Sequence, residues 1–345
     1  MRILYGVQTT GQGHLVRSTP IIRALRDRGH EVDVLLSGPP ADPSWMARIG
    51  PPVVQRPGLT FIADGGRVRY LATARAARPL AFLADVLRRP ALRPDLVVTD
   101  YEPVTAWMAR RARLRSVGLG HLYAFAWPEV PRARGNPVTR TVLRHFAPAT
   151  VAAGTHWAPF GAPLLPPTID PDLRGLRREA IEDDLVLVYL AFEPLERLVP
   201  LLRQMRHHRF HVYARVPVAT ADGNVAVRPL SRPAFLADLG RCGGVVANAG
   251  FTLASECLHL GIRLLVQPIE GHLEQESNAM ALEELALATA TGRLTRGGLA
   301  TWLGTTAPAS QRYPDVTGAV TDWLDGGAEE DLAALSARLW ADCRS

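Results

Sequence analysis

The chain has 345 residues, of which 47% are hydrophobic, and a formal net charge of +6 at pH 7. It is too long for one typical domain and long enough for two hydrophobic cores, and no uncharged apolar run reaches the roughly 18 residues of a membrane-spanning helix. Three widely spaced cysteines (Cys242, Cys257 and Cys343) fit neither a zinc site nor a disulfide framework, and no secretory pattern follows Met1, so we expect a cytoplasmic protein.

Positive charge is concentrated in the first half of the chain. Residues 1–150 contain 22 arginines and 10 acidic residues, residues 151–345 contain 17 arginines and 23 acidic residues, and there is no lysine. The first part therefore carries a formal +12 and the second a formal −6. This asymmetry favours an anionic partner for the first half, such as a membrane surface or a phosphorylated acceptor, although arginines that are simply solvated give the same pattern. We expect no nucleic-acid partner.

Strands and helices alternate along the first half, which predicts a parallel sheet with helices on both faces. The expected strands are 2–8, 31–36, 96–99 and 116–119, and the expected helices are 18–28 and 104–112.

A proline-rich connector, residues 163–171, then separates a second run of the same pattern. The expected strands there are 185–191, 210–214, 225–228, 243–247 and 263–268, and the expected helices are 196–207, one from about residue 252, 316–324 and 329–343. We therefore predict two α/β domains, residues 1–162 and 185–325, a linker over 163–184 and a C-terminal helix within 326–345.

The first strand ends in a glycine-rich turn, Thr9–His14. Gly11 and Gly13 let the chain turn tightly and let a ligand approach the backbone. The dinucleotide-binding fingerprint is not matched, because Val16 stands where its third glycine belongs and no acidic residue ends the second strand. This pattern disfavours a nicotinamide or flavin site.

His14 and Asp100 both follow strands of the expected N-terminal sheet, so both should reach its carboxyl edge, where such sheets bind ligands. A carboxylate that bonds one imidazole nitrogen fixes the tautomer and raises the basicity of the other nitrogen. Such a pair suits a general base that acts on a hydroxyl. In the alternative interpretation, His14 only caps the helix or lines an acceptor pocket.

A second motif occupies residues 245–283. A buried strand, the turn Asn248–Gly250 and an amphipathic helix from near Thr252 form an arrangement that binds phosphate, because free N–H groups and the helix dipole point at the anion. Glu256, one turn into the helix, is placed to take two ribose hydroxyls. A further strand leads to an expected loop with Glu274, Gln275 and Asn278.

Together these motifs resemble the GT-B glycosyltransferases, in particular the branch that contains the bacterial lipid II-forming N-acetylglucosaminyltransferase and uncharacterised prokaryotic relatives. The matching segments are Gly11–His14, Asp95–Pro103, Arg228–Phe235 and Asn248–Asn278. The resemblance implies two Rossmann-like domains that face each other across a cleft, with the acceptor in the first and a nucleotide sugar in the second. It also implies a C-terminal helix that packs back toward the N-terminal domain.

Residue roles follow from the same resemblance. The N–H groups of Gly250, Phe251 and Thr252, after Asn248, would bind the diphosphate, and Glu256 would bind the ribose. Glu274 and Gln275 would bind sugar hydroxyls, with Asn278 just beyond them. His14 would be the base for the acceptor, with Asp100 as its partner and Gly11 and Gly13 beside it. The residues implied around the nucleotide base are Arg228, Leu230 and Ser231.

The sequence departs from the family pattern at two loops. The loop after the first strand of the second domain, Ala191–Pro194, has no serine or glycine to contact phosphate, which leaves Glu193 to face the acceptor or the sugar. Asn248 adds no positive charge for the leaving diphosphate, and Arg232 is a candidate source of one. Because a helix dipole can stabilise that charge, we expect no metal and no cofactor beyond the nucleotide sugar, and we expect Asp170 and Asp172 to bind nothing.

The arginine-rich, amphipathic segment 71–93 has two interpretations. It either rests on an anionic membrane surface beside a lipid-linked acceptor or packs its leucine and phenylalanine face into the core.

We therefore predict a metal-independent hexosyl- or N-acetylhexosaminyltransferase that moves a sugar from a UDP-linked donor to a hydroxyl of a lipid-linked or small-molecule acceptor. It would act in the cytoplasm or at the inner face of the membrane. A nucleotide-sugar 2-epimerase on the same fold is one alternative, and it would need extra carboxylates and no acceptor pocket. A non-catalytic sugar-nucleotide-binding protein is the other. The Phe192–Glu193 loop favours this last alternative, whereas His14 and Asp100 argue against it.

Overall fold

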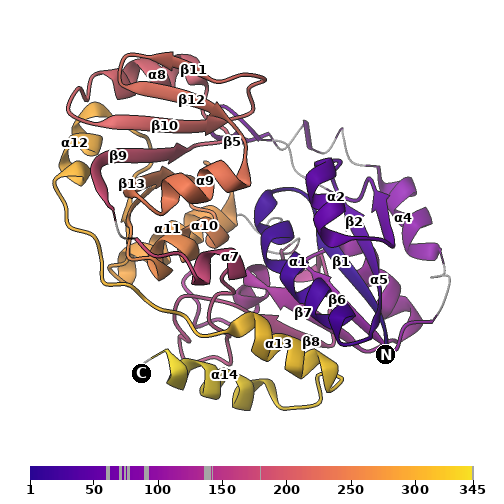
Figure 1. Ribbon diagram of the computed structural model, residues 1–345. Coiled ribbons are helices and arrows are strands. Elements are labelled where there is room, and N and C mark those ends of the chain that lie inside the picture. The colour runs from indigo at the N-terminus through magenta and orange to yellow at the C-terminus, as the bar shows by residue number, and fades with distance from the viewer. Residues whose placement is uncertain are drawn as a thin grey trace.

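The protein folds into two α/β units that lie side by side, one from each half of the chain (Figure 1). The computed structural model describes residues 1–59, 63–69, 72–73, 75, 78–88, 93–135, 141, 143–178 and 180–343. The first unit is built on a six-stranded sheet and the second on a seven-stranded sheet. The prediction of an α/β fold with two units is therefore confirmed. Within the described ranges, none of the helices is long and apolar enough to cross a membrane.

The N-terminal sheet is parallel throughout, in the order β3-β2-β1-β6-β7-β8. Its central strands are buried on both faces, which explains why they are continuous apolar runs rather than alternating ones. Helix α1 packs on one face, and α4 and α5 pack on the other. The elements are β1 (Arg2–Gln8), α1 (Gln12–Asp27), β2 (Glu31–Ser37), α2 (Pro43–Ile49), β3 (Val53–Arg56), α4 (Pro79–Leu87), β6 (Leu96–Asp100), α5 (Pro103–Ala112), β7 (Ser116–Gly120), the 3₁₀ helix η1 (His121–Ala126) and β8 (Val151–Gly154).

The C-terminal sheet has the order β11-β12-β10-β9-β13-β14-β15 and is parallel except for β11. Helices α8 and α12 cover one face, and α9, α10 and α11 cover the other. The elements are α7 (Pro171–Arg174), β9 (Glu182–Tyr189), α8 (Leu195–Arg203), β10 (Arg209–Ala214), β11 (Thr220–Asp222), β12 (Val225–Pro229), α9 (Arg232–Leu239), β13 (Cys242–Ala247), α10 (Phe251–His259), β14 (Arg263–Val266), α11 (Leu273–Glu284), β15 (Thr289–Ala290) and α12 (Arg296–Leu303).

The chain then returns to the first unit through α13 (Val316–Asp325) and α14 (Leu332–Asp342). Apolar side chains of both helices, such as Trp323 and Leu335, join the core around β1 and α1. Ser336 and Trp340 of α14 also donate hydrogen bonds to the carbonyl of Leu164, at 2.6 and 2.7 Å. The predicted return of the C-terminal helix is confirmed. Helix α13 lies inside the range 185–325 assigned to the second domain, yet its apolar face packs on α1.

The starts of helices α1 and α11 differ from the prediction. Helix α1 begins at Gln12 rather than near residue 18, and Glu274 and Gln275 lie in the first turn of α11 rather than in a loop. Both helices begin after weak sequence signals, because a glycine precedes α1 and the His272 ring caps α11, whereas Ser, Thr, Asp and Asn are the usual caps. Strand β9 begins at Glu182, inside the range assigned to the linker.

The two units touch along their junction. A hairpin of the first unit, β4 (Ala63–Asp64) and β5 (Arg67–Val68), meets the segment before α11. Glu270 N–H donates to the Gly66 carbonyl at 2.7 Å, and Val68 N–H donates to the Glu270 carbonyl at 3.0 Å. Deeper in the junction, Nε2 of His121 lies 2.6 Å from Oδ1 of Asn278. These contacts fix how the predicted site residues of the two units face each other.

Candidate active site

His14 lies in the first turn of α1, immediately beyond the end of β1. Gly11 precedes the helix with φ of 141°, and no side chain caps the helix start. A Cβ on Gly11 would meet no other atom within 4 Å, so the backbone conformation alone favours glycine there. The early start of α1 therefore places His14 at an uncapped helix N-terminus.

Asp100, at the end of β6, meets His14 as the sequence predicts. Nδ1 of His14 lies 3.0 Å from Oδ1 of Asp100, whose side chain is 1% exposed. Two further donors reach the same carboxylate, since Arg17 Nε and Ser18 Oγ each lie 2.8 Å from Oδ2. Sequence reasoning missed Arg17. Its spacing of three residues from His14 is a signal, because residues three apart share one face of a helix.

The ionised form of Asp100 is stabilised by these neighbours. Burial by itself raises the pKa of this carboxyl, but the positive charge of Arg17 brings the pKa below its usual value. Asp100 is therefore a buried anion next to an imidazole.

Helix α10 begins at the second predicted motif. Gly250 precedes it, and no side chain caps its first N–H groups. Asn248 is turned toward its own unit, where its Nδ2 donates to the Gln267 carbonyl at 3.0 Å. The N-terminus of α10 therefore presents uncapped backbone donors, which is the arrangement that binds anions.

The N-termini of α1 and α10 meet at the junction of the two units (Figure 1). A Cβ built on Gly13 would lie 2.7 Å from Oγ1 of Thr252 and 3.3 Å from its Cβ. Any larger residue at position 13 would therefore require the Thr252 side chain or the backbone to shift. The fold thus brings the two glycine turns, more than two hundred positions apart in the sequence, to one place.

Glu256 lies one turn into α10 and is 1% exposed. Arg232 donates to both of its oxygens, at 2.6 Å to Oε1 and 3.2 Å to Oε2, and also donates to Asp170 at 3.0 Å. Burial raises the pKa of Glu256, opposed by Arg232 and reinforced by Asp170. Arg232 is thus engaged by two carboxylates rather than free for a leaving group, and Asp170 also caps α7.

The comparison with known families is consistent with this geometry. A profile of the family described as glycosyl transferase family 1 matches residues 1–303. The chain belongs to glycosyl transferase family 1. No curated protein matches this glycosyltransferase.

Solved structures resemble the glycosyltransferase over its whole length. The calicheamicin glycosyltransferase CalG4 matches with a TM-score of 0.63 at 15% identity, over 96% of this chain and 100% of that chain. The Streptomyces sp. SF2575 glycosyltransferase SsfS6 complexed with thymidine diphosphate matches with a TM-score of 0.52 at 17% identity, over 100% and 96%. MurG of Acinetobacter baumannii matches with a TM-score of 0.52 at 15% identity, over 94% and 99%. These likenesses confirm the predicted GT-B fold.

The residues expected around the nucleotide base of the donor have partners within the protein. Arg228 Nη1 lies 2.9 Å from the buried carboxylate of Asp238. Ser231 caps α9, where its hydroxyl accepts from Ala234 N–H at 3.4 Å, and Leu230 packs against the core of the second unit. The side chains of Arg228 and Ser231 therefore both bond groups of the second unit.

The residues expected around the donor sugar follow β14. Gln275 Oε1 accepts from Ile269 N–H at 3.0 Å, which holds the turn before α11. Asn278 is fully buried and bonds His121 and, through Nδ2 at 2.9 Å, the Ala249 carbonyl, so it joins the two units. For Glu274, the structure records no hydrogen-bond partner among the described residues. Its first-turn position in α11 also puts a carboxylate at a helix N-terminus.

Phe251 has a second role beyond its N–H group. Its ring stacks on His121 of the first unit, with centroids 3.9 Å apart and an interplanar angle of 7°, and also on Trp157, at 4.9 Å. The side chain that opens α10 thus helps to hold the two units of the glycosyltransferase together. Sequence reasoning missed His121, which no motif marks.

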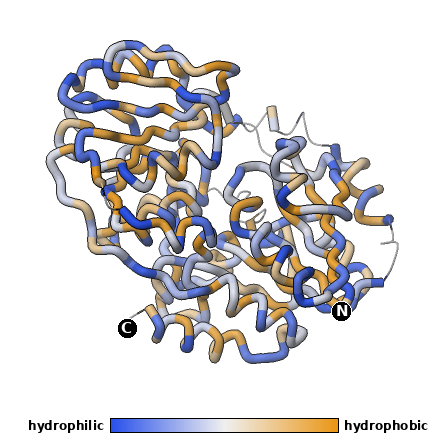
Figure 2. The backbone as a smooth tube through the Cα atoms, viewed as in Figure 1, coloured by the Kyte–Doolittle hydropathy of each residue, from blue (hydrophilic) through white to orange (hydrophobic). Residues whose placement is uncertain are grey.

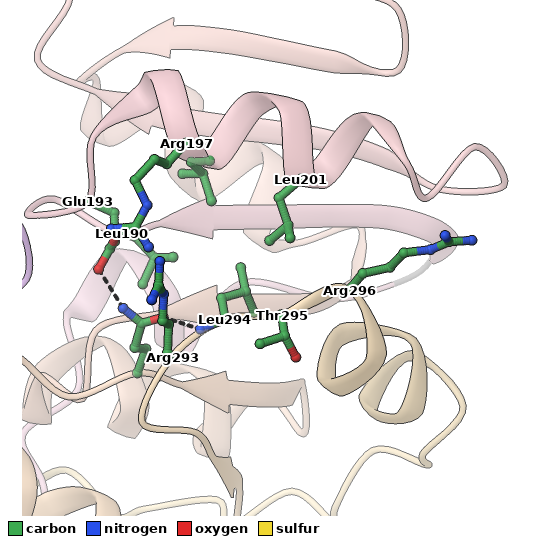
Figure 3. Close-up of a pocket in the computed structure, with 10 residues that line it drawn as sticks. Leu190, Glu193, Arg197, Leu201, Arg293, Leu294, Thr295 and Arg296 are labelled. Carbon is green, nitrogen blue, oxygen red and sulfur yellow. Dashed lines mark hydrogen bonds between the residues drawn. The ribbon is translucent and has the colours of Figure 1, made fainter.

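Glu193 lies at the rim of an open cavity of about 330 Å³ between α8 and α12 (Figure 3). Its carboxylate accepts from Gln267 Nε2 at 2.7 Å, and the Gly66 turn of the first unit lies against it. Arg197 and Arg293 line the same cavity (Figure 3). The loop after β9 therefore places the Glu193 carboxylate among arginines, and its expected contact with the acceptor or the sugar stays a prediction.

Proposed function

We propose that this glycosyltransferase transfers a sugar from a UDP-linked donor to an acceptor hydroxyl, with His14 as the base. The observation that carries the proposal is the approach of Gly13 to Thr252, which brings the N-termini of α1 and α10 together. Two uncapped helix starts next to each other favour an anion between them. A diphosphate held there would put the anomeric carbon of the donor near His14.

The donor half of the site would be provided by the second unit. The N–H groups of Phe251 and Thr252 would bind the diphosphate, and Glu256 would accept hydrogen bonds from the ribose. A carboxylate oxygen has more than one acceptor position, so Glu256 can bond Arg232 and a ribose hydroxyl at the same time. Glu274 and Gln275 would contact the sugar, and the backbone of 228–231 would contact the base.

The reaction follows from this placement. The acceptor hydroxyl gives its proton to Nε2 of His14 while its oxygen attacks the anomeric carbon. The bond from that carbon to the diphosphate breaks, and the negative charge that develops on the diphosphate is stabilised by the N–H groups and dipoles of the helices. The chemistry proposed here uses no metal. Transfer should therefore be unchanged by EDTA, and a loss of activity that added Mg²⁺ restores would contradict this part.

We also propose that the N-terminal unit contacts an anionic membrane surface, at the cytoplasmic face, where a lipid-linked acceptor would lie. Part of the arginine-rich segment 71–93 falls outside the described residues. Its helix α4 lies on the outer side of the first unit and consists mainly of apolar residues (Figure 2). Phe82 packs into the core. In contrast, Leu80, Leu83 and Leu87 are 81%, 51% and 49% exposed and lie on one side of the helix. Arg78 and Arg88 flank this stripe.

Co-sedimentation with vesicles tests the membrane contact. We expect Leu80→Gln/Leu83→Gln to weaken binding to vesicles rich in phosphatidylglycerol by about tenfold, because the apolar area buried at the interface falls. Val218→Gln, which changes an apolar residue of the second unit that is 65% exposed, is the control. Equal binding by the double variant and the wild type, or no binding by either, would contradict the proposal.

Screening donors tests the function itself. Thermal unfolding in the presence of UDP-, dTDP- and GDP-sugars should show the largest shift with a UDP-sugar, since a ligand at about 100 times its Kd adds about 2.7 kcal/mol. The product of the stabilising donor then separates the alternatives. A transferred or hydrolysed sugar supports a transferase, a sugar epimerised at C2 supports an epimerase, and binding without turnover supports a non-catalytic protein. A larger shift with dTDP-sugars would overturn the choice of UDP.

A further inference from the structure

Arg17 is the residue of α1 that contacts both members of the proposed catalytic pair. It lies one helical turn after His14 and is buried. Its Nε donates to Oδ2 of Asp100 at 2.8 Å, and its Nη2 donates to Oδ1 of the same carboxylate. The same Nη2 lies 2.6 Å from Nδ1 of His14. One guanidinium therefore bridges the carboxylate and the imidazole.

These contacts determine which nitrogen of His14 carries the proton. A guanidinium has five N–H donors and no acceptor, so at 2.6 Å the His14 Nδ1 has to accept from Arg17. A proton on Nδ1 would point at the N–H of Arg17. A neutral ring that accepts at Nδ1 carries its one proton on Nε2. The 3.0 Å separation of Nδ1 from Asp100 Oδ1 then joins two acceptors and is not a hydrogen bond.

The base proposed above needs the other tautomer. Nε2 can take a proton from the acceptor hydroxyl only if the ring proton sits on Nδ1, where it would be donated to Asp100. In the structure Oδ1 of Asp100 instead accepts from Arg17 Nη2, and Oδ2 accepts from Arg17 Nε and from Ser18 Oγ, each at 2.8 Å. The geometry thus opposes the catalytic tautomer in the protein without substrates.

We propose that Arg17 is a positioning residue that holds His14 in the Nε2–H tautomer, and that His14 becomes a base only when Arg17 gives up Nδ1 and leaves it to Asp100. No bond between heavy atoms is made or broken in this change. The ring releases the proton of Nε2 to solvent water and takes one from solvent water at Nδ1, so its net charge is unchanged. The inference rests on the proposed function, because the tautomer matters for transfer only if His14 is the base.

The tautomer is measured directly by two-bond ¹H–¹⁵N correlation spectra of ¹⁵N-labelled protein. At about pH 8.5, well above the ordinary histidine pKa of about 6.5, a neutral ring gives different patterns for Nδ1–H and Nε2–H. The signals of His14, one of 10 histidines, are those missing from His14→Gln. We expect the wild type to show mainly Nε2–H, and Arg17→Met, which removes the donors, to show mainly Nδ1–H.

Controls keep the result independent of folding. Arg23→Gln changes an exposed arginine of the same helix and should leave the His14 pattern unchanged. Arg17→Lys keeps a charge beside Asp100 but has no planar fork to bridge it to the ring, so it should shift the pattern in the same direction by a smaller amount. If the wild type already shows mainly Nδ1–H, the proposal is wrong even if no variant folds. An unchanged pattern in folded Arg17→Met or Arg17→Lys also overturns it.

The test of the proposed function remains separate. A wild-type rate of sugar transfer by His14→Ala would show that His14 is not the base, while the tautomer measurement would remain valid. If the wild type shows mainly Nδ1–H and its transfer activity depends on His14, then Arg17 does not have the proposed role, but His14 is still the base.

Discussion

The two units each contain a buried carboxylate held by an arginine, and the comparison of the two is instructive. Asp100 and Glu256 are both 1% exposed. Arg17 donates to both oxygens of Asp100, and Arg232 donates to both oxygens of Glu256. The partners beyond the arginine differ. Asp100 also accepts from Ser18 and adjoins His14, whereas Glu256 shares its arginine with another carboxylate, Asp170.

This difference reverses the direction of the pKa shift. Burial is the largest influence on both groups and raises both pKa values, but Arg17 brings the pKa of Asp100 below normal, whereas the pKa of Glu256 remains raised. Equal burial therefore does not imply equal charge stabilisation. Asp100 also accepts from the Ser18 hydroxyl, and ribose hydroxyls would supply donors of that kind to Glu256. The two buried carboxylates therefore differ in the direction of their pKa shift, which is downward in the first unit and upward in the second.

Removing the imidazole beside Asp100 should have the largest effect. We expect His14→Ala to lower the rate of transfer by about 10²- to 10⁴-fold, the usual contribution of a positioned general base. The matched control, His145→Ala, changes an exposed histidine of the same unit and should keep the wild-type rate. Initial rates at saturating donor measure the difference, and a His14→Ala rate within twofold of the wild type would show that the base assignment is wrong.

Removing the charge of Glu256, the carboxylate of the second unit, should weaken nucleotide binding. We expect Glu256→Gln to weaken nucleotide affinity by roughly 10- to 150-fold, since hydrogen bonds to a charged group contribute about 1.5–3 kcal/mol. Glu283→Gln, an exposed position on α11, is the control. Isothermal titration with UDP provides the Kd, and an unchanged Kd in a folded Glu256→Gln variant contradicts the ribose assignment.

Gly13 connects the two regions, so its substitution tests whether they have to meet. A Cβ there would lie 2.7 Å from Thr252 Oγ1, and we expect Gly13→Ala to destabilise the protein by about 1–3 kcal/mol. Adding Thr252→Ala removes that oxygen and should recover part of the loss, which a double-mutant cycle in chemical denaturation measures. Gly292→Ala, where a Cβ meets nothing within 4 Å, is the control. Independent, additive effects of the two substitutions would mean that the residues do not touch.

The opposite pKa shifts of Asp100 and Glu256 predict that the two groups change the stability with pH in opposite directions. These effects should be smaller than those of the substitutions above. The depressed pKa of Asp100 contributes stability above its unfolded value of about 3.9, and this stability is lost as the pH falls through the folded pKa. The raised pKa of Glu256 means that the folded state binds the proton more tightly, so stability falls as the pH rises from about 4.3 to the folded pKa. The stability advantage of the wild type over Asp100→Asn should therefore grow with pH, and its advantage over Glu256→Gln should shrink. Urea unfolding between pH 3 and about 7 measures both slopes, and slopes of the same sign would contradict the comparison.

The fold was largely predictable from the sequence because apolar runs and punctuating glycines and prolines are local signals. The β1 and β6 strands and the phosphate-type turn before α10 all belong to this class. The first residues of α1 and α11 could not be predicted, because the residues at their N-cap positions, Gly11 and His272, are weak signals of a helix start. The same reason explains why Glu274 was expected in a loop.

The partners of the site residues were much less predictable. The pairing of His14 with Asp100 followed from the rule that parallel strands end at one edge. The spacing of Arg17 puts it on the same helix face as His14, but its contacts with both residues also depend on side-chain directions, which the spacing alone does not determine. Arg232 bonds Glu256 and Asp170 from sequence separations of 24 and 62 residues. Only the packing of α9 against α10 and the connector sets this arrangement, so it is visible only in three dimensions.

The central claim is that the donor binds at α10 and the base acts from α1, and a paired measurement on the same protein preparations tests it most directly. UDP is titrated into the wild type, His14→Ala and Glu256→Gln, and the turnover of the stabilising donor is measured for each. We expect His14→Ala to bind UDP within about twofold of the wild type while turnover is lost, and Glu256→Gln to lose affinity. UDP affinity that falls in His14→Ala but is unchanged in Glu256→Gln would contradict the account.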